Sequence, residues 1–216
     1  MPLKTDIYHE IKDFTPAALD GTDHFVYIYG SYATSQFRPD SDLDIMFAVE
    51  NYNQADFQTI KEFVVTLHTK HGLTVDEEVP YKNKLLIPYQ DIDEAAKLAA
   101  FKTTGHDEYT VPAIPDDPAL LGSQNVRARL VLNALTTPHV FVTGNEASYQ
   151  NLRAKCEKAL VRLACGLTDS ADPSPADLQE ALFKGQNGET GQAHLGYKTE
   201  RPEVVTYICE LIGRNI

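Results

Sequence analysis

Residues 30–44 read GSYATSQFRPDSDLD, and they connect two apolar segments. The segment before them, residues 24–29 (HFVYIY), is rich in β-branched and aromatic residues, which predicts a strand that ends in a tight turn at Gly30-Ser31. Glycine at a strand end lets the backbone approach a ligand closely, and the hydroxyl and amide of Ser31 can meet a phosphate oxygen. The junction therefore predicts a turn suited to an anion.

The end of the same stretch carries two aspartates in a predicted second strand, residues 42–49. Side chains alternate along a strand, so Asp42 and Asp44 should share one face while Leu43 and Ile45 enter the core. Two carboxylates so close repel each other unless a positive charge lies between them. Oxygen ligands of this kind suit Mg²⁺, which takes the rest of its shell from water and substrate phosphates.

A third acidic strand is expected after a helix. Apolar residues recur at helical spacing over 54–71, Gly72 is a stop signal, and residues 73–79 (LTVDEEV) resemble a strand. Alternation puts Asp76 and Glu78 on one face, so either could supply a third carboxylate. We favour Asp76 because it lies centrally, and Glu78 stays the alternative.

The remaining pattern divides the chain. A helix over 5–19 precedes the strands, a helical pattern covers 92–101, and prolines mark a loop over 103–123. Beyond it, helical spacing prevails, and the single candidate strand is 140–142. The helices expected there cover 126–135, 147–163, 175–183 and 202–212. We predict an α+β protein with a catalytic core over 1–100 (a small mixed sheet with helices), a connecting loop over 101–123 and a C-terminal helical module over 124–216.

Composition limits the partners. The 216 residues include 31 acidic and 19 basic side chains, which gives a net charge of −12. A protein that binds the phosphates of nucleic acid usually has a basic face. Because this chain is strongly acidic, a nucleic-acid partner is not expected. No stretch predicts a membrane span or a signal peptide, and we expect a cytoplasmic protein in which Cys156, Cys165 and Cys209 are buried free thiols.

Taken together, Gly30-Ser31, the Asp42-x-Asp44 pair and the later acidic strand resemble the signature of the nucleotidyltransferase superfamily typified by DNA polymerase beta. The order strand, strand, helix, strand over residues 5–90 is also similar to that family's catalytic core. Within the superfamily, the stretch looks most like the small bacterial nucleotidyltransferases. Many of those carry Arg-Gly where this chain has Thr34-Ser35. The phosphate contact of that arginine would be missing unless Arg38 supplies it, and a plain surface arginine is the equal alternative.

The resemblance implies transfer of a nucleoside monophosphate from an NTP, with ATP expected, to an acceptor hydroxyl and release of pyrophosphate. The residues implied to bind the nucleotide are Gly30, Ser31, Arg38 and Ser41. Those implied to act in catalysis are Asp42, Asp44, Asp76 and Glu78, and Asp42, Asp44 and Asp76 would hold two Mg²⁺ ions.

The acceptor stays open. The first hypothesis is an enzyme that modifies a small-molecule acceptor, such as an antibiotic or a metabolite. The alternative is an antitoxin-like transferase that nucleotidylates or blocks another protein. A third reading keeps the fold without the activity. The oligomeric state does not follow from the sequence. His68 and His71 form an H-x-x-H pattern, which we interpret as the solvated end of a helix and not as a metal site.

Overall fold

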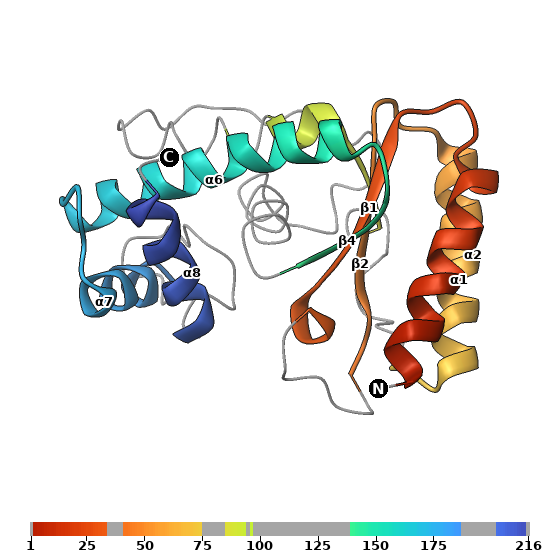
Figure 1. Cartoon of the computed structure of the whole chain (residues 1–216), viewed down its shortest axis with the longest axis horizontal. Helices are drawn as coiled ribbons and strands as arrows, with labels where there is room; N and C mark the ends of the chain where they lie inside the picture. The colour runs from red at the N-terminus through yellow and green to blue at the C-terminus, as the bar shows by residue number, and fades with distance from the viewer. Residues whose placement is uncertain are drawn as a thin grey trace. The chain divides into compact units, whose positions relative to one another are not determined.

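The computed structural model describes residues 2–33, 41–74, 85–93, 96, 139–186 and 202–214. The described strands form a four-stranded sheet with the order β3-β2-β1-β4, of which Figure 1 labels β1, β2 and β4. The strands are β1 (His24–Tyr29), β2 (Asp44–Val49), β3 (Leu86–Pro88) and β4 (Val140–Gly144). β1 runs antiparallel to β2 and to β4, whereas β2 and β3 are parallel. The small mixed sheet agrees with the predicted α+β core.

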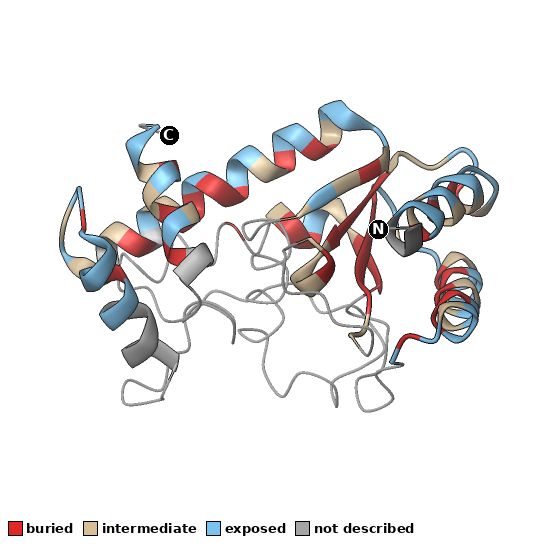
Figure 2. Cartoon of the chain, turned by 60° about the horizontal axis from the view of Figure 1, so that its bottom comes forward, coloured by how far each residue is buried: buried red, intermediate tan, exposed pale blue. Residues whose placement is uncertain are grey.

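Helices α1 (Pro2–Ala18) and α2 (Gln54–His71) pack side by side on one face of this sheet (Figure 1). Both ends of α2 are capped. At the start, the side chain of Asn53 accepts a hydrogen bond from the amide of Ala55, and at the end Gly72 adopts a left-handed conformation. Alternate strand residues point toward the helices, and Figure 2 shows how strongly burial concentrates in the strands. The core members from the strands are Val26, Ile28, Ile45, Phe47, Val49, Leu86 and Val142.

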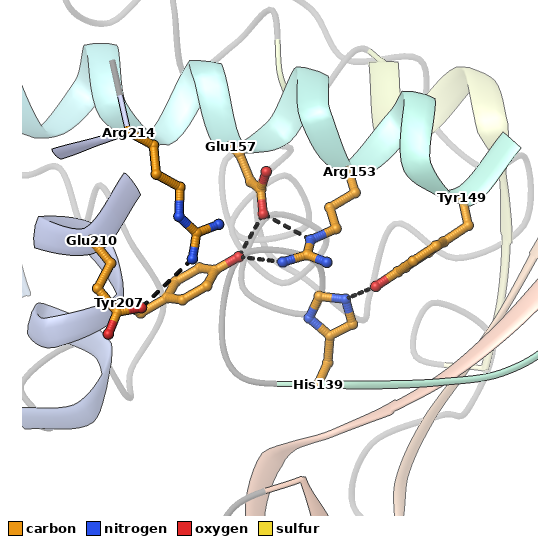
Figure 3. Close-up of polar contacts among 7 residues, drawn as sticks. All are labelled: His139, Tyr149, Arg153, Glu157, Tyr207, Glu210 and Arg214. Atoms are coloured by element: carbon orange, nitrogen blue, oxygen red, sulfur yellow. Dashed lines mark hydrogen bonds and ion pairs between the residues drawn. The ribbon is translucent and has the colours of Figure 1, made fainter. Parts of the chain in front are cut away.

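The opposite face of the sheet is aromatic. Phe25, Tyr27 and Tyr29 alternate with the core residues of β1, and the ring of Tyr149 packs edge-on against Phe25. Nε2 of His139 lies 2.6 Å from the hydroxyl of Tyr149 (Figure 3). Because residues paired across β1 and β2 share a face, the register Tyr29↔Asp44 puts Asp44 on the aromatic side, away from α1 and α2.

Several boundaries differ from the sequence prediction. β1 and α2 have their predicted limits, but β2 begins at Asp44, and Leu73 and Thr74 are not in a strand. Residues 75–79, the rest of the predicted third strand, lie outside the described residues. The strand that pairs with β2 on its outer side is β3, because Phe47, Ala48 and Val49 find their partners at residues 86–88.

The candidate strand over residues 140–142 is real and longer. It is β4, which pairs with β1 and accepts a 3.0 Å hydrogen bond from the hydroxyl of Tyr8 at the carbonyl of Val142. The predicted helical module over 124–216 thus contributes one strand to the sheet. The chain divides into two compact units, one of residues 1–90 with 139–150 and the other of residues 91–138 with 151–216.

In the second unit, the described residues are mainly helical: α6 (Glu146–Thr168) continues into it, followed by α7 (Pro175–Gln186) and α8 (Pro202–Gly213). A buried carboxylate links α6 to α8, since Glu157 accepts hydrogen bonds of 2.7 Å from both Arg153 and the hydroxyl of Tyr207 (Figure 3). The predicted helix over 126–135 lies outside the described residues. Among the helices described, none is both long and apolar enough to cross a membrane.

The expectation of three buried thiols is correct for one cysteine. All three are free, but only Cys156 is buried, whereas Cys165 and Cys209 are partly exposed on α6 and α8. Burial raises the pKa of the Cys156 thiol far above its ordinary value, and the nearby carboxylates of Asp93 and Glu157 add to the shift.

Candidate active site

The turn that follows β1 has the geometry that the sequence predicts. Residues Gly30–Tyr32 form a single 3₁₀ turn directly after Tyr29, closed by a 3.2 Å hydrogen bond from the amide of Ala33 to the carbonyl of Gly30. Gly30 has φ +69°, a left-handed conformation that strains any residue with a Cβ. Ser31 follows in the same turn and is half-buried.

The carboxylate of Asp44 packs against this turn. A Cβ placed on Gly30 would overlap Oδ2 of Asp44 and would lie 2.8 Å from its Cγ. The side chain of Asp44 is 7% exposed, although it belongs to the first residue of β2. Glycine at position 30 is therefore required twice: for the backbone conformation and for the space that the carboxylate occupies.

Asp42 lies two residues before Asp44, and Leu43 between them enters the core, 4% exposed. Asp42 itself is half-buried. Burial and, second, the negative charge of Asp42 raise the pKa of Tyr32, the last residue of the 3₁₀ turn, to about 12. The two carboxylates thus flank a buried leucine at the end of the sheet where β1 finishes. Ser41 is half-buried just before them.

One residue of this region does not follow from the motif. His68, in the last turn of α2, is 3% exposed, and its Nε2 accepts a 3.2 Å hydrogen bond from the amide of Leu43. The interpretation of His68 as solvated is wrong, because the residue lies four positions after buried Val64 on the apolar side of the helix. That spacing was the signal available in the sequence. His71 differs: its Nε2 contacts Glu10 of α1 at 2.9 Å.

Three of the predicted site residues belong to parts of the chain that the structure does not describe. Arg38, Asp76 and Glu78 lie outside the described residues, as do Thr34 and Ser35. Within the described ranges, no group of three or more His, Cys, Asp or Glu side chains is arranged to hold a metal ion. Asp42 and Asp44 supply only oxygen ligands. The Asp44 carboxylate packs against the turn, in the space that a Cβ on residue 30 would fill. This donor set fits a hard divalent cation such as Mg²⁺ that takes its other ligands from elsewhere.

Comparison with known proteins agrees with this geometry. The family model described as "Polymerase beta, Nucleotidyltransferase" matches residues 22–97, a range that contains β1, the Gly30 turn, β2, α2 and β3. Neither a curated protein nor a solved structure matches the chain significantly. The match supports nucleotidyl transfer as the general class of reaction. The similarity to the polymerase beta nucleotidyltransferase family thus covers residues 22–97 of the 216-residue chain.

Proposed function

We propose that the chain is a Mg²⁺-dependent nucleotidyltransferase that moves a nucleoside monophosphate from an NTP, with ATP the expected donor, to a hydroxyl of a small-molecule acceptor. One observation carries the proposal: the Gly30 turn packs directly against the Asp44 carboxylate. A turn that begins with the small residues Gly30 and Ser31 and can receive a phosphate then adjoins carboxylates that can receive a divalent cation. Such proximity is the basic requirement of phosphoryl chemistry, which depends on positioning and charge neutralisation.

In this proposal the residues divide the work. The turn amides and the hydroxyls of Ser31 and Ser41 would bind the triphosphate, with Arg38 as a further contact. Asp42, Asp44 and Asp76 would hold two Mg²⁺ ions, with Glu78 as the other candidate for the third carboxylate. When bound, Mg²⁺ would neutralise the charge on the phosphoryl oxygens.

The transfer itself is a displacement at the α-phosphorus. The acceptor oxygen forms a bond to that phosphorus while the bond to pyrophosphate breaks, and the proton of the acceptor hydroxyl passes to the carboxylate of Asp76 or Glu78. No covalent intermediate on the protein is needed. The chain's own contribution is to fix the carboxylates and the triphosphate relative to each other.

A small acceptor, such as an antibiotic or a metabolite, is favoured over nucleic acid by charge. The chain has a net charge of −12, so a long polyanion would meet overall repulsion. A protein acceptor remains the alternative, and the assay below separates the two.

The test is transfer of label from α-³²P NTPs in the presence of Mg²⁺ to three sets of acceptors: aminoglycosides and lincosamides, extracted metabolites, and cell proteins. The wild type should label a small molecule, and Asp44→Ala should abolish the labelling. The matched control is Asp20→Asn, which removes an exposed carboxylate from the turn between α1 and β1 and should leave the rate unchanged.

Three outcomes would contradict parts of the proposal. Activity that survives Asp44→Ala would remove the mechanism. Label that appears only in proteins would replace the small acceptor by the antitoxin-like alternative. If calorimetry detects no binding of Mg·NTP to the wild type, the fold has been kept without the activity.

A further inference from the structure

A buried histidine holds the backbone between the two aspartates. The amide of Leu43 donates to Nε2 of His68 at 3.2 Å, and Nδ1 of the same ring lies 2.7 Å from the carbonyl of Val64, one turn earlier in α2. A backbone amide can only donate and a carbonyl can only accept. The two contacts therefore require the tautomer with hydrogen on Nδ1 and a free lone pair on Nε2.

The hydrogen bond between His68 and the Leu43 amide lies directly before the start of β2, between the two aspartates. Leu43 precedes the first residue of β2, and the described pairing of β1 with β2 ends at Tyr29↔Asp44. The sheet ladder therefore does not fix the backbone of Leu43 from the β1 side. The side chain of Leu43 is buried in the core, and its amide hydrogen bond is made to a helix that the chain reaches only after β2.

We propose that His68 is a positioning residue for the metal-binding segment: by accepting the Leu43 amide, it sets the orientation of the Asp42 and Asp44 carboxylates toward Mg²⁺. The inference rests on the proposed function of that pair. Groups that orient metal ligands without touching the metal commonly change metal affinity or activity when they are replaced. A mere packing role would predict a loss of stability alone.

Two isosteres separate the two hydrogen bonds of the ring. The side-chain oxygen of glutamine reaches the position of Nε2 and can accept the Leu43 amide, whereas the side-chain nitrogen of asparagine lies near the position of Nδ1 and can donate to Val64. His68→Gln thus keeps the contact with the active-site segment, and His68→Asn keeps the contact within α2. His68→Leu removes both, and His71→Gln is the control on the same helix turn.

The experiment measures four quantities on the full chain: the affinity for Mn²⁺ as a probe of the metal site, the protection of the Leu43 amide from hydrogen exchange, and kcat and KM of transfer. His68→Asn and His68→Leu should lose protection at Leu43 and weaken Mn²⁺ binding about 10–100-fold. The loss of transfer should fall on kcat and not on the KM of the acceptor. His68→Gln should retain protection and stay close to the wild type, as should His71→Gln.

Across the His68 variants, the affinity for Mn²⁺ must fall whenever the Leu43 amide loses its protection from hydrogen exchange, whichever variant keeps the hydrogen bond to that amide. A variant that loses protection and keeps full Mn²⁺ affinity, or the reverse, overturns the proposal, and so does a wild type that binds no Mn²⁺. If Mn²⁺ binding follows the series but the wild type transfers no nucleotide to any acceptor, His68 still positions a metal site and the proposed function is what fails.

Discussion

The contact between Gly30 and Asp44 makes a specific prediction for the variant Gly30→Ala. Two costs arise in this variant. Gly30 has φ +69°, and an L-residue in the left-handed region costs about 1–2 kcal/mol of folding free energy. In addition, the new Cβ would overlap the carboxylate of Asp44, so the turn or the aspartate must move.

The displacement can be bounded from the structure. The Cβ would lie 2.8 Å from Cγ of Asp44, and ordinary contact begins at 3.4 Å, so the carboxyl carbon must retreat by at least about 0.6 Å and the nearer Oδ2 by more. A displacement on the order of 1 Å in a reacting constellation costs on the order of 10²-fold in rate. We therefore expect a loss of transfer activity near 10²-fold together with weaker Mn²⁺ binding.

Gly21→Ala is the matched control. Gly21 has φ +76°, and a Cβ placed on it would meet no atom within 4 Å. It therefore carries the same backbone strain without the overlap. Chemical denaturation should give Gly21→Ala a loss of about 1–2 kcal/mol and Gly30→Ala a larger one, while only Gly30→Ala should lose activity and metal affinity. If the two variants behave alike in all three measurements, the carboxylate does not pack against the turn.

Three further predictions concern stability and reactivity. Tyr207→Phe should cost about 1–3 kcal/mol in denaturant unfolding, because buried Glu157 loses a hydrogen-bond donor. Arg214→Gln, at an exposed position directly after α8, should change the stability little, and equal effects of the two variants would contradict the difference in burial. Hydrogen bonding to Lys70 lowers the pKa of Glu10 in the folded protein. The contact should therefore stabilise the fold fully at pH values above the ordinary carboxyl pKa, and this stabilisation should be lost as the pH falls through the lowered pKa of the folded state. Glu10→Gln should accordingly cost about 0.2–1 kcal/mol at neutral pH and nothing in acid, and a pH-independent cost would refute it. Cys156 should react with a thiol reagent last of the three cysteines, with mass spectrometry of the native protein as the measurement, and early labelling would show that its site opens readily.

Local signals predicted β1 and α2, in the first half of the chain, with their observed limits. The limits of β1 and α2 follow from the run at 24–29 and from the helical period over 54–71 that ends before Gly72. Those signals act within a few residues, and the structure retains them. The glycine turn and the Asp-x-Asp pair are local in the same sense, which explains why the motif could identify one end of the sheet.

Long-range pairing was harder to foresee. β3 has only three residues, and β4 pairs with a strand more than a hundred positions earlier, so neither shows an extended alternating pattern. His68 was missed for a related reason. The H-x-x-H pattern suggested a pair on one exposed surface, yet His68 reaches inward to Leu43 while His71 contacts Glu10. With 3.6 residues per turn, side chains three positions apart differ by about 60° around the helix axis, so one can point into the core while the other lies at its edge.

The two contacts at Asp44 and Leu43 address the same physical problem. Asp42 and Asp44 carry like charges, and without a bound cation repulsion would favour conformations that move them apart. The Asp44 carboxylate meets the turn at Gly30, and the backbone of Leu43 is held by His68, so restraints from two different elements act on this short segment. Such restraint before binding lowers the reorganisation needed when a cation and a triphosphate arrive. It also fits the presence of a glycine in the left-handed conformation and of a buried polar ring at position 68 beside the proposed site.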